Sequence, residues 1–421
     1  MCSPRQQHIL ATAGRKCCPL LSRDDQTPTV RMAQPGESGH LDGSASFPWD
    51  RPSDTGMSSE LRTDTRKAER MTRQGMLQKA SLAAAVAFVT ACVSASDNDN
   101  AVEIEETQSV SSSSPDPGLP PGTTVVPLPQ FEHQPRTVAI PNQVGFLRGE
   151  ILGRGSEAIV IINGGPGLNS AFVTRLHQGM AQSLPGRRII RYDQRGLGGS
   201  TPTTADQNTI TGAVDDVESI RRFLGVARIH LVGQSFGGFV AGAYASTHPR
   251  NVASIAFVDP LPPLPADSPF TTQGFDAINA YYDGLLAQGI LEPGRDDDPP
   301  GVGWNRIIGV YFANPLVVPV EITAPSTVPV SAVGDAVDAD YQANGAPLVA
   351  NLDRVRVPVL VIGGGSSGFG PTFAQGAVAA LAAAHPKLVV IPGAGHLPWF
   401  DKPAETFGAL RAFFDGCAPG N

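Results

Sequence analysis

Ser235 lies at the centre of Gly233-Gln234-Ser235-Phe236-Gly237, a segment with the pattern Gly-x-Ser-x-Gly. An apolar run, residues 228–232, precedes the segment and a helix-like stretch follows it, which predicts a strand, a sharp turn and a helix. The glycines leave room for a serine on a strained turn, where its hydroxyl is free to attack a carbonyl carbon. The predicted chemistry is acyl transfer with Ser235 as nucleophile, which needs a base and an acid nearby.

The pattern alone is weak evidence, because 46 of the 421 residues are glycine. Gly364-Gly365-Ser366-Ser367-Gly368 also fits it and also follows an apolar run. Ser235 is favoured because further polar or glycine-rich turns follow apolar runs in the order expected around a nucleophilic serine. These turns are Asn163-Gly164-Gly165-Pro166-Gly167, Asp193 to Ser200, and Gly393-Ala394-Gly395-His396. The backbone N–H groups of Gly165 and Phe236 are the predicted donors to a carbonyl oxygen that gains negative charge.

His396 is the predicted general base, since it lies on a loop after the last apolar run, with Trp399 and Phe400 placed to shield it from water. The acid is harder to assign, because no Asp or Glu occurs between Asp353 and Asp401. Asp259, at the end of the apolar run 254–258, is the predicted orienting acid and keeps the chain order Ser, Asp, His. The alternative is that Asp259 only begins an Asp-Pro turn.

Four motifs in this order resemble the proline iminopeptidase branch of the α/β-hydrolase superfamily, over about residues 135–415. They are Gly-Gly-Pro-Gly, Asp-Gln-Arg-Gly-x-Gly-x-Ser, Gly-Gln-Ser-Phe-Gly-Gly and Gly-His. The resemblance implies an aminopeptidase acting on short peptides with an N-terminal proline or a similar small residue. Aligned on Pro371, the family's aspartate falls on Ser367, so the chain departs from the family pattern there.

The resemblance also implies that carboxylates of a cap domain hold the free amino group of the substrate. Glu292 and Glu321 are the candidates, and no motif decides between them. Trp399, close to the predicted base, is a further candidate substrate contact. Residues 262–350 contain eleven acidic and two basic residues, so the formal net charge of −8 is concentrated in this region. A solvated acidic surface is the alternative interpretation for most of these carboxylates.

Apolar runs alternate with helical patterns on both sides of the Pro- and Gly-rich stretch 261–352. This pattern predicts an α/β-hydrolase fold of the α/β class, with a mostly parallel central sheet, helices on both faces and an inserted, mainly helical cap. The predicted core is residues 125–260 and 353–421, and the predicted cap is residues 261–352.

Residues 1–70 lack apolar periodicity and are predicted to be a disordered or untranslated extension. From Met71 a short cationic segment leads into an apolar core that ends in Val89-Thr90-Ala91-Cys92, which resembles a bacterial lipoprotein box. We therefore expect a signal peptide at 71–92, a lipid anchor on Cys92 and a flexible linker at 93–124. Export to the bacterial periplasm or cell envelope follows from this interpretation, and a cytoplasmic location follows if Cys92 stands there by chance.

The remaining sequence features argue against several other classes of protein. No Cys/His cluster indicates a metal, no phosphate-binding glycine motif indicates a nucleotide, and no basic run indicates nucleic acid. We expect no cofactor, a small-molecule or short-peptide substrate, and membrane attachment through the lipid on Cys92. A carboxylesterase is the near alternative. A non-catalytic, surface-anchored binding protein is the alternative that the missing acid before Pro371 favours.

Overall fold

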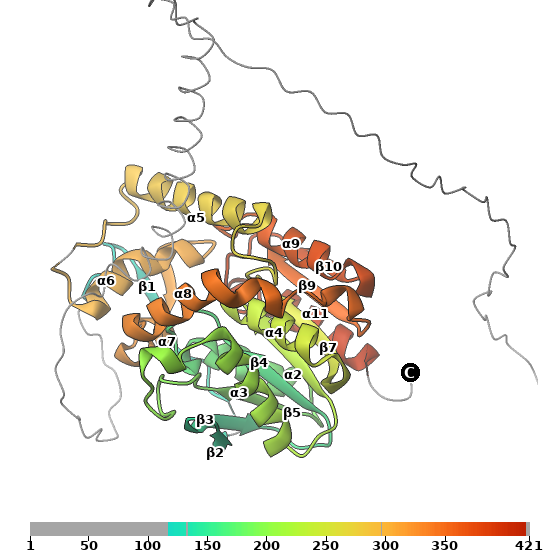
Figure 1. Cartoon of the computed structure of the whole chain (residues 1–421). Coiled ribbons are helices and arrows are strands. Elements are labelled where there is room, and N and C mark those ends of the chain that lie inside the picture. The colour runs from blue at the N-terminus through green and yellow to red at the C-terminus, as the bar shows by residue number, and fades with distance from the viewer. Residues whose placement is uncertain (1–116, 132–133, 296, 418–421) are drawn as a thin grey trace, which may run out of the picture. The chain divides into compact units, whose positions relative to one another are not determined.

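The centre of the molecule is an eight-stranded sheet with strand order β10-β9-β7-β6-β4-β5-β3-β2 (Figure 1). The computed structural model describes residues 117–131, 134–295 and 297–417, so the predicted extension, signal peptide and Cys92 lie outside the described residues. The first two strands, β2 and β3, are antiparallel, and the other six run parallel to one another. The strands are β2 Arg136–Asn142, β3 Gly145–Leu152, β4 Ala158–Ile162, β5 Arg188–Tyr192, β6 Ile229–Gln234, β7 Val252–Val258, β9 Val359–Gly364 and β10 Lys387–Ile391.

Helices cover both faces of this sheet, which explains why its central strands are continuous apolar runs. Successive residues of β4 alternate between two apolar cores: Val160 and Ile162 pack on one side, Ile159 and Ile161 on the other. The first core contains residues of α3 (Ile210–Phe223), α4 (Phe236–Thr247) and α9 (Thr372–Ala380), and the second contains residues of α2 (Thr174–Ser183) and α11 (Pro403–Gly416). The predicted fold class is confirmed in this arrangement.

The segment between β7 and β9 holds the helices of the predicted cap, which gather above the sheet in Figure 1. They are α5 Pro269–Ala287, α6 Pro300–Ile307, α7 Val320–Thr323 and α8 Ser331–Leu348. No helix of the described residues combines the length and apolarity needed to cross a bilayer.

A second, two-stranded sheet joins the start of the described chain to the cap. In it, β1 (Thr124–Val126) pairs in parallel with β8 (Val317–Pro319). The Asn305 side-chain amide donates to the carbonyl of Pro117 over 3.0 Å, and Leu119 packs against the apolar core. Residues 117–124, which the sequence assigns to the linker, are therefore packed on the cap, because their apolar side chains and backbone groups find partners there.

Candidate active site

Ser235 sits on the sharp turn between β6 and α4, with φ 51° and ψ −127°. For a residue with a side chain this backbone conformation costs on the order of 1–3 kcal/mol. A Cβ atom on Gly233 would lie 2.6 Å from the carbonyl oxygen of Gly237, and a Cβ atom on Gly237 would lie 2.1 Å from that of Ile162. Close backbone approach therefore demands both glycines of the predicted pattern, and the surrounding core holds the strained turn in place.

His396 and Asp259 come together beside this turn, although 137 positions separate them in the chain. The Nδ1 atom of His396 lies 2.6 Å from Oδ2 of Asp259, and the two residues are 3 % and 1 % exposed. A carboxylate only accepts hydrogen bonds, so Nδ1 is the donor here, and in the neutral ring the lone pair is then on Nε2. His396 and Ser235 line the same cavity. The ring is therefore in the tautomer that a general base at Ser235 requires.

The loop after β9 supplies Asp259 with hydrogen-bond donors. The backbone N–H of Gly364 donates to Oδ1 over 2.9 Å, and the hydroxyl of Ser367 donates to Oδ2 over 2.6 Å. Ser367 is the residue on which the family's aspartate falls in the alignment. The two residues are thus neighbours in space, with the carboxylate directly after β7, the strand beside β6, and the hydroxyl on the loop where an aspartate was expected.

Gln234 connects the base to the turn after β4, a role that the sequence did not indicate. Its side-chain oxygen accepts the N–H of Gly164 over 2.9 Å, and its amide nitrogen lies 3.3 Å from Nε2 of His396. Gln234 is fully buried. Because an amide nitrogen is only a donor, this contact also requires an unprotonated Nε2 on His396. A glutamine at the variable position of the pattern carries no signal of its own, so only the fold reveals the contact.

Gly165 and Phe236 contribute backbone N–H groups on the wall that holds Ser235. Phe236 is the first residue of α4, where a helix has no internal acceptor for the N–H. Gly165 adjoins Gly164, whose own N–H is taken by Gln234. Both residues of the predicted pair therefore line the same cavity as Ser235.

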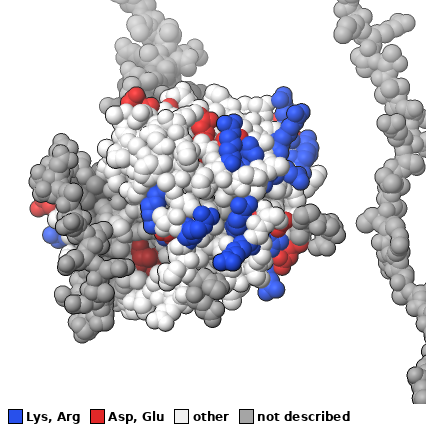
Figure 2. Space-filling model, turned by 90° about the horizontal axis from the view of Figure 1, so that it is seen from below, with Lys and Arg blue, Asp and Glu red and all other residues white. Residues whose placement is uncertain are grey.

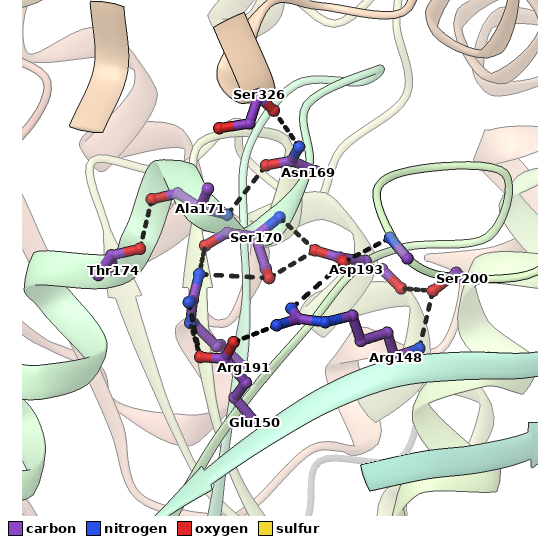
Figure 3. Close-up of polar contacts among 11 residues, drawn as sticks. Arg148, Glu150, Asn169, Ser170, Ala171, Thr174, Arg191, Asp193, Ser200 and Ser326 are labelled. Atoms are coloured by element: carbon purple, nitrogen blue, oxygen red, sulfur yellow. Dashed lines mark hydrogen bonds and ion pairs between the residues drawn. The ribbon is translucent and has the colours of Figure 1, made fainter. Parts of the chain in front are cut away.

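A buried polar network fixes Ser170, which begins the short helix η2 (Ser170–Val173) after the turn that carries Gly165 (Figure 3). Asp193 accepts the N–H and hydroxyl of Ser170 over 3.0 and 2.6 Å, and Arg191 donates to the carbonyl of Ser170 over 2.5 Å. Arg191 also pairs with Glu150 on β3 over 2.6 Å. Burial acts to raise the pKa of Glu150, but the charges and hydrogen bonds of Arg191 and Arg148 outweigh burial and lower it. The network thus ties η2 to β3 and β5.

Asp193 and Arg195 both belong to the loop after β5, and Arg195 holds this loop from its other side. The guanidinium of Arg195 binds both carboxylate oxygens of Asp216 on α3, each over 2.8 Å. This pair anchors the loop after β5 to the helix that covers one face of the sheet.

The cavity at Ser235 has a volume of about 90 Å³ and mostly apolar walls. Asp338 of α8 is the one acidic residue among the described residues that line it. Burial, together with the neighbouring charge of Asp335, raises the pKa of Asp338 to about 6, although Gln342 donates to it over 2.6 Å. Apolar walls come from Pro166, Leu168, Phe172, Leu261, Phe275, Phe369 and Phe373. Asp338 was missed from the sequence because no motif separates it from the other cap carboxylates.

The three predicted substrate contacts do not line this cavity. Arg175 holds Glu321 through two hydrogen bonds of 2.7 and 3.0 Å, and Glu292 pairs with Arg306. Trp399, on α10 (Pro398–Asp401), is 1 % exposed and lines a different cavity beside α2 and α11. Ion pairing thus engages the two glutamates, and packing in the second core directs Trp399 away from Ser235.

Tyr311 and Phe369 enclose the imidazole in place of the predicted Trp399 and Phe400. Their ring centroids lie 5.4 and 4.6 Å from that of His396. The backbone N–H of His396 donates to the carbonyl of Tyr311 over 2.8 Å, so the cap is attached directly to the loop that carries the base. In the described part of the chain, no group of three or more His, Cys, Asp or Glu side chains gathers as metal ligands would.

Residues 157–403 match the family model described as alpha/beta hydrolase fold. The chain belongs to the α/β-hydrolase family. The hydrolase is 26 % identical to the proline iminopeptidase of Lactobacillus helveticus strain DPC 4571 over 283 residues, which are 63 % of this chain and 92 % of the relative. A shorter stretch of 102 residues is 38 % identical to the proline iminopeptidase of Xylella fastidiosa strain 9a5c, covering 24 % of this chain and 31 % of that protein.

Solved structures resemble the hydrolase over about two thirds of its length. An esterase from Exiguobacterium antarcticum aligns with a TM-score of 0.52 and 19 % identity, covering 66 % of this chain and all of the esterase. A proline iminopeptidase-related protein from Thermus thermophilus aligns with a TM-score of 0.50 and 21 % identity, covering 68 % of this chain and 99 % of that protein. At these identities the likeness shows the fold. Together the comparisons support a hydrolase of the α/β-hydrolase family.

Proposed function

We propose that the protein is a serine hydrolase that cleaves a small amide or ester through an acyl-enzyme. The observation that carries this proposal is the buried hydrogen bond of 2.6 Å between His396 and Asp259, beside a serine on a strained turn. The arrangement supplies a nucleophile, a base in the required tautomer and a carboxylate that stabilises the imidazolium once it forms.

In the first step, Oγ of Ser235 attacks the carbonyl carbon and its proton passes to Nε2 of His396. The carbonyl oxygen becomes negative and accepts hydrogen bonds from the N–H groups of Gly165 and Phe236. His396 then gives its proton to the leaving amine or alcohol, and the acyl group stays on Ser235. Water, deprotonated by His396, attacks the acyl-enzyme in the same way and releases the acid and the free serine.

The substrate class that we propose is a short peptide or amide with a free amino group on a small N-terminal residue, such as proline. The names of the relatives favour this class, and so does Asp338, whose carboxylate lines the cavity within the cap. We assign to Asp338 the amine-binding role that the sequence left between Glu292 and Glu321. A cavity of about 90 Å³ suits a small acyl group better than a long chain.

A fluorophosphonate probe tests the serine mechanism directly, because it reacts with an activated serine and does not depend on substrate identity. We expect stoichiometric labelling of the protein and no labelling of Ser235→Ala. Ser366→Ala is the matched control, since Ser366 lies in the second Gly-x-Ser-x-Gly match but is exposed on a loop. Absence of labelling in folded protein would instead favour the non-catalytic binding protein.

Substrate selection is tested by comparing prolyl and alanyl anilides with short acyl esters of the same leaving-group class. A peptidase with an amine site should prefer the anilides with a free amino group over their N-acetylated forms. Equal or better hydrolysis of simple esters, with no effect of N-acetylation on the anilides, would assign the protein to the carboxylesterases.

We also propose export and lipid anchoring through Cys92, which lies outside the described residues. The support is the sequence segment 71–92 alone. Replacing Cys92 by Ala should move the protein from the membrane fraction to the soluble fraction of the producing bacterium when the membranes are washed with about 0.5 M NaCl, which releases proteins held by charge alone. An unchanged distribution would contradict the anchor.

A further inference from the structure

Basic side chains that are scattered along the sequence come together where the parallel strands begin. Each of six cations stands just before one of these strands or at its first residue. Because parallel strands all begin at the same edge of a sheet, the six cations share that edge. All six are exposed, and no ion pair within the described residues involves them. We call this surface the basic face: Arg154, Arg228, Arg250, Arg354, Arg356 and Lys387.

The carboxylates Glu157 and Asp353 stand before the same strands, and the six cations outnumber them, so this edge carries a net positive field. Figure 2, a view of the molecule from below, shows Lys and Arg side chains spread over one side, with smaller groups of Asp and Glu beside them. No local pattern in the chain indicates this surface, because the cations occur singly and in pairs between apolar runs. Only the parallel topology brings them to one edge.

The basic face lies at the edge of the sheet opposite to the cavity. Ser235, Asp259 and His396 follow the ends of β6, β7 and β10, whereas the basic face precedes the starts of these strands. A strand of six residues, such as β6, is about 20 Å long at 3.3 Å per residue. This length exceeds the Debye length of about 10 Å at 0.1 M salt, so the acidic cap does not cancel the field of the basic face.

Exposed apolar side chains accompany these cations. Phe223 ends α3 shortly before Arg228 and is 41 % exposed, and Leu388 follows Lys387 and is 40 % exposed. Cations interspersed with exposed aromatic and aliphatic side chains are typical of surfaces that lie on a bilayer, where the apolar groups enter the headgroup region. A site for single-stranded nucleic acid would need a row of stacking aromatic rings, and the basic face has only Phe223.

We propose that the basic face binds the anionic headgroups of a lipid bilayer and turns the cavity away from it, toward the aqueous phase. A lipid on Cys92 would hold the protein at the membrane without setting its orientation, and the basic face would set which side of the protein meets the headgroups. Residues 93–116, between Cys92 and the described chain, span about 80 Å when fully extended, so an anchor at Cys92 permits this orientation. The proposal concerns orientation and does not depend on whether Ser235 is catalytic.

Vesicle sedimentation tests the proposal with the Cys92→Ala form of the full chain, in which the predicted lipid cannot attach. The vesicles are pure phosphatidylcholine, or the same lipid with about a third of phosphatidylglycerol. We expect binding to the anionic vesicles only, and its loss between 0.1 and 0.5 M NaCl. Neutralising one cation should lower the partition coefficient about fivefold, and the triple variant Arg250→Gln/Arg354→Gln/Arg356→Gln should lower it about a hundredfold.

Arg295→Gln is the matched control for Arg250→Gln, because Arg295 is an exposed arginine of the cap. It should leave vesicle binding unchanged. Equal labelling by the fluorophosphonate probe, or an equal thermal midpoint, shows that each variant is folded. If the triple variant does not fold, the single variants Arg250→Gln and Lys387→Gln still test the proposal through the expected loss of vesicle binding, about fivefold.

Three results would overturn the proposal. One is an absence of binding to anionic vesicles, as expected if the acidic segment 93–116, with six carboxylates and no Lys or Arg, occupies the basic face instead. Another is binding that the triple variant leaves intact or that Arg295→Gln weakens as much as Arg250→Gln does. The third is a competition experiment at equal phosphate concentration in which the protein binds duplex DNA more tightly than it binds the vesicles.

Discussion

The two sides of the cavity are built in different ways. On the core side, hydrogen bonds hold the groups around the base: Asp259 receives three donors, and Gln234 spans from Gly164 to His396. On the cap side the walls are apolar, and Asp338 is held by one side chain of its own helix, Gln342. The core side therefore positions the reacting groups, whereas the cap side limits the size of the substrate and contributes one charge, that of Asp338.

This difference separates two kinds of defect. A change on the core side should lower kcat, because it disturbs groups whose interactions strengthen in the transition state. A change on the cap side should raise KM for some substrates and leave the others alone. The following substitutions test that division, beginning with the largest expected effect.

Asp259→Asn should lower kcat by about ten-thousand-fold, since an amide cannot stabilise the imidazolium and favours the wrong tautomer of His396. Steady-state kinetics on an anilide or ester measures the loss. Asp216→Asn is the control, because Asp216 is equally buried but pairs with Arg195 away from the cavity. The control should lose stability by roughly 3 kcal/mol or more and keep kcat within a few fold. Kinetics unchanged in Asp259→Asn would leave the acid unassigned.

Ser367→Asp in the Asp259→Asn background should recover activity about a hundredfold over the single variant, because a carboxylate would again stand beside His396. The hydroxyl of Ser367 already lies 2.6 Å from the Oδ2 atom that His396 contacts. In the unmodified chain, the same substitution should lower both kcat and stability, because two buried carboxylates would repel each other. A double variant no better than Asp259→Asn would show that the loop after β9 cannot host the acid.

Gln234→Leu should lower kcat by about ten- to a hundredfold with little change in KM. Leucine fills a similar volume but leaves the buried N–H of Gly164 unpaired and frees Nε2 of His396, at a cost of roughly 1–3 kcal/mol. Thermal unfolding, measured alongside, separates lost stability from lost turnover. A variant with normal kcat and a lowered melting temperature would limit Gln234 to a structural role.

The core side of the cavity could be predicted from the sequence more fully than the cap side. The core elements are set by local patterns: apolar runs for strands covered on both faces, and glycines where backbones touch at Ser235. Ser235, Asp259 and His396 could be selected because strand order and chain order constrain them together. The contacts of Ser367 with Asp259 and of Gln234 with His396 could not be predicted, because the partners lie 108 and 162 positions apart and no motif links them.

The cap resists prediction for a different reason. Its helices were partly visible in the sequence, but the pairing of β1 with β8 joins two three-residue strands with no long periodic pattern. Its many carboxylates look alike in the sequence, and only packing decides that Arg175 and Arg306 engage Glu321 and Glu292 while Asp338 lines the cavity. Whether a cap carboxylate is ion-paired or lines the cavity thus depends on the residues that pack beside it in the folded cap.

Asp338→Asn should raise KM about tenfold for substrates with a free amino group and leave KM for esters unchanged, because a charge-assisted hydrogen bond is lost. The neighbouring Asp335→Asn, on the same helix but not lining the cavity, is the control. In the unmodified protein KM for amino substrates should rise as pH falls through about 6, where Asp338 gains its proton. An ester KM that changes as much as the anilide KM would contradict an amine site.

Asp338→Asn should weaken substrate binding but stabilise the folded protein at neutral and higher pH. Because burial raises the pKa of Asp338 to about 6, above its value in the unfolded chain, the folded protein holds this proton more tightly. Its contribution to stability is complete below about pH 4 and is lost as pH rises through about 6. Asp338→Asn should therefore raise the free energy of unfolding at about pH 8, by about 1–3 kcal/mol, and not at about pH 4. The expected variant thus has a raised KM for amino substrates and a raised free energy of unfolding at about pH 8. This combination would show that the charge of Asp338 serves binding and lowers the stability of the folded protein.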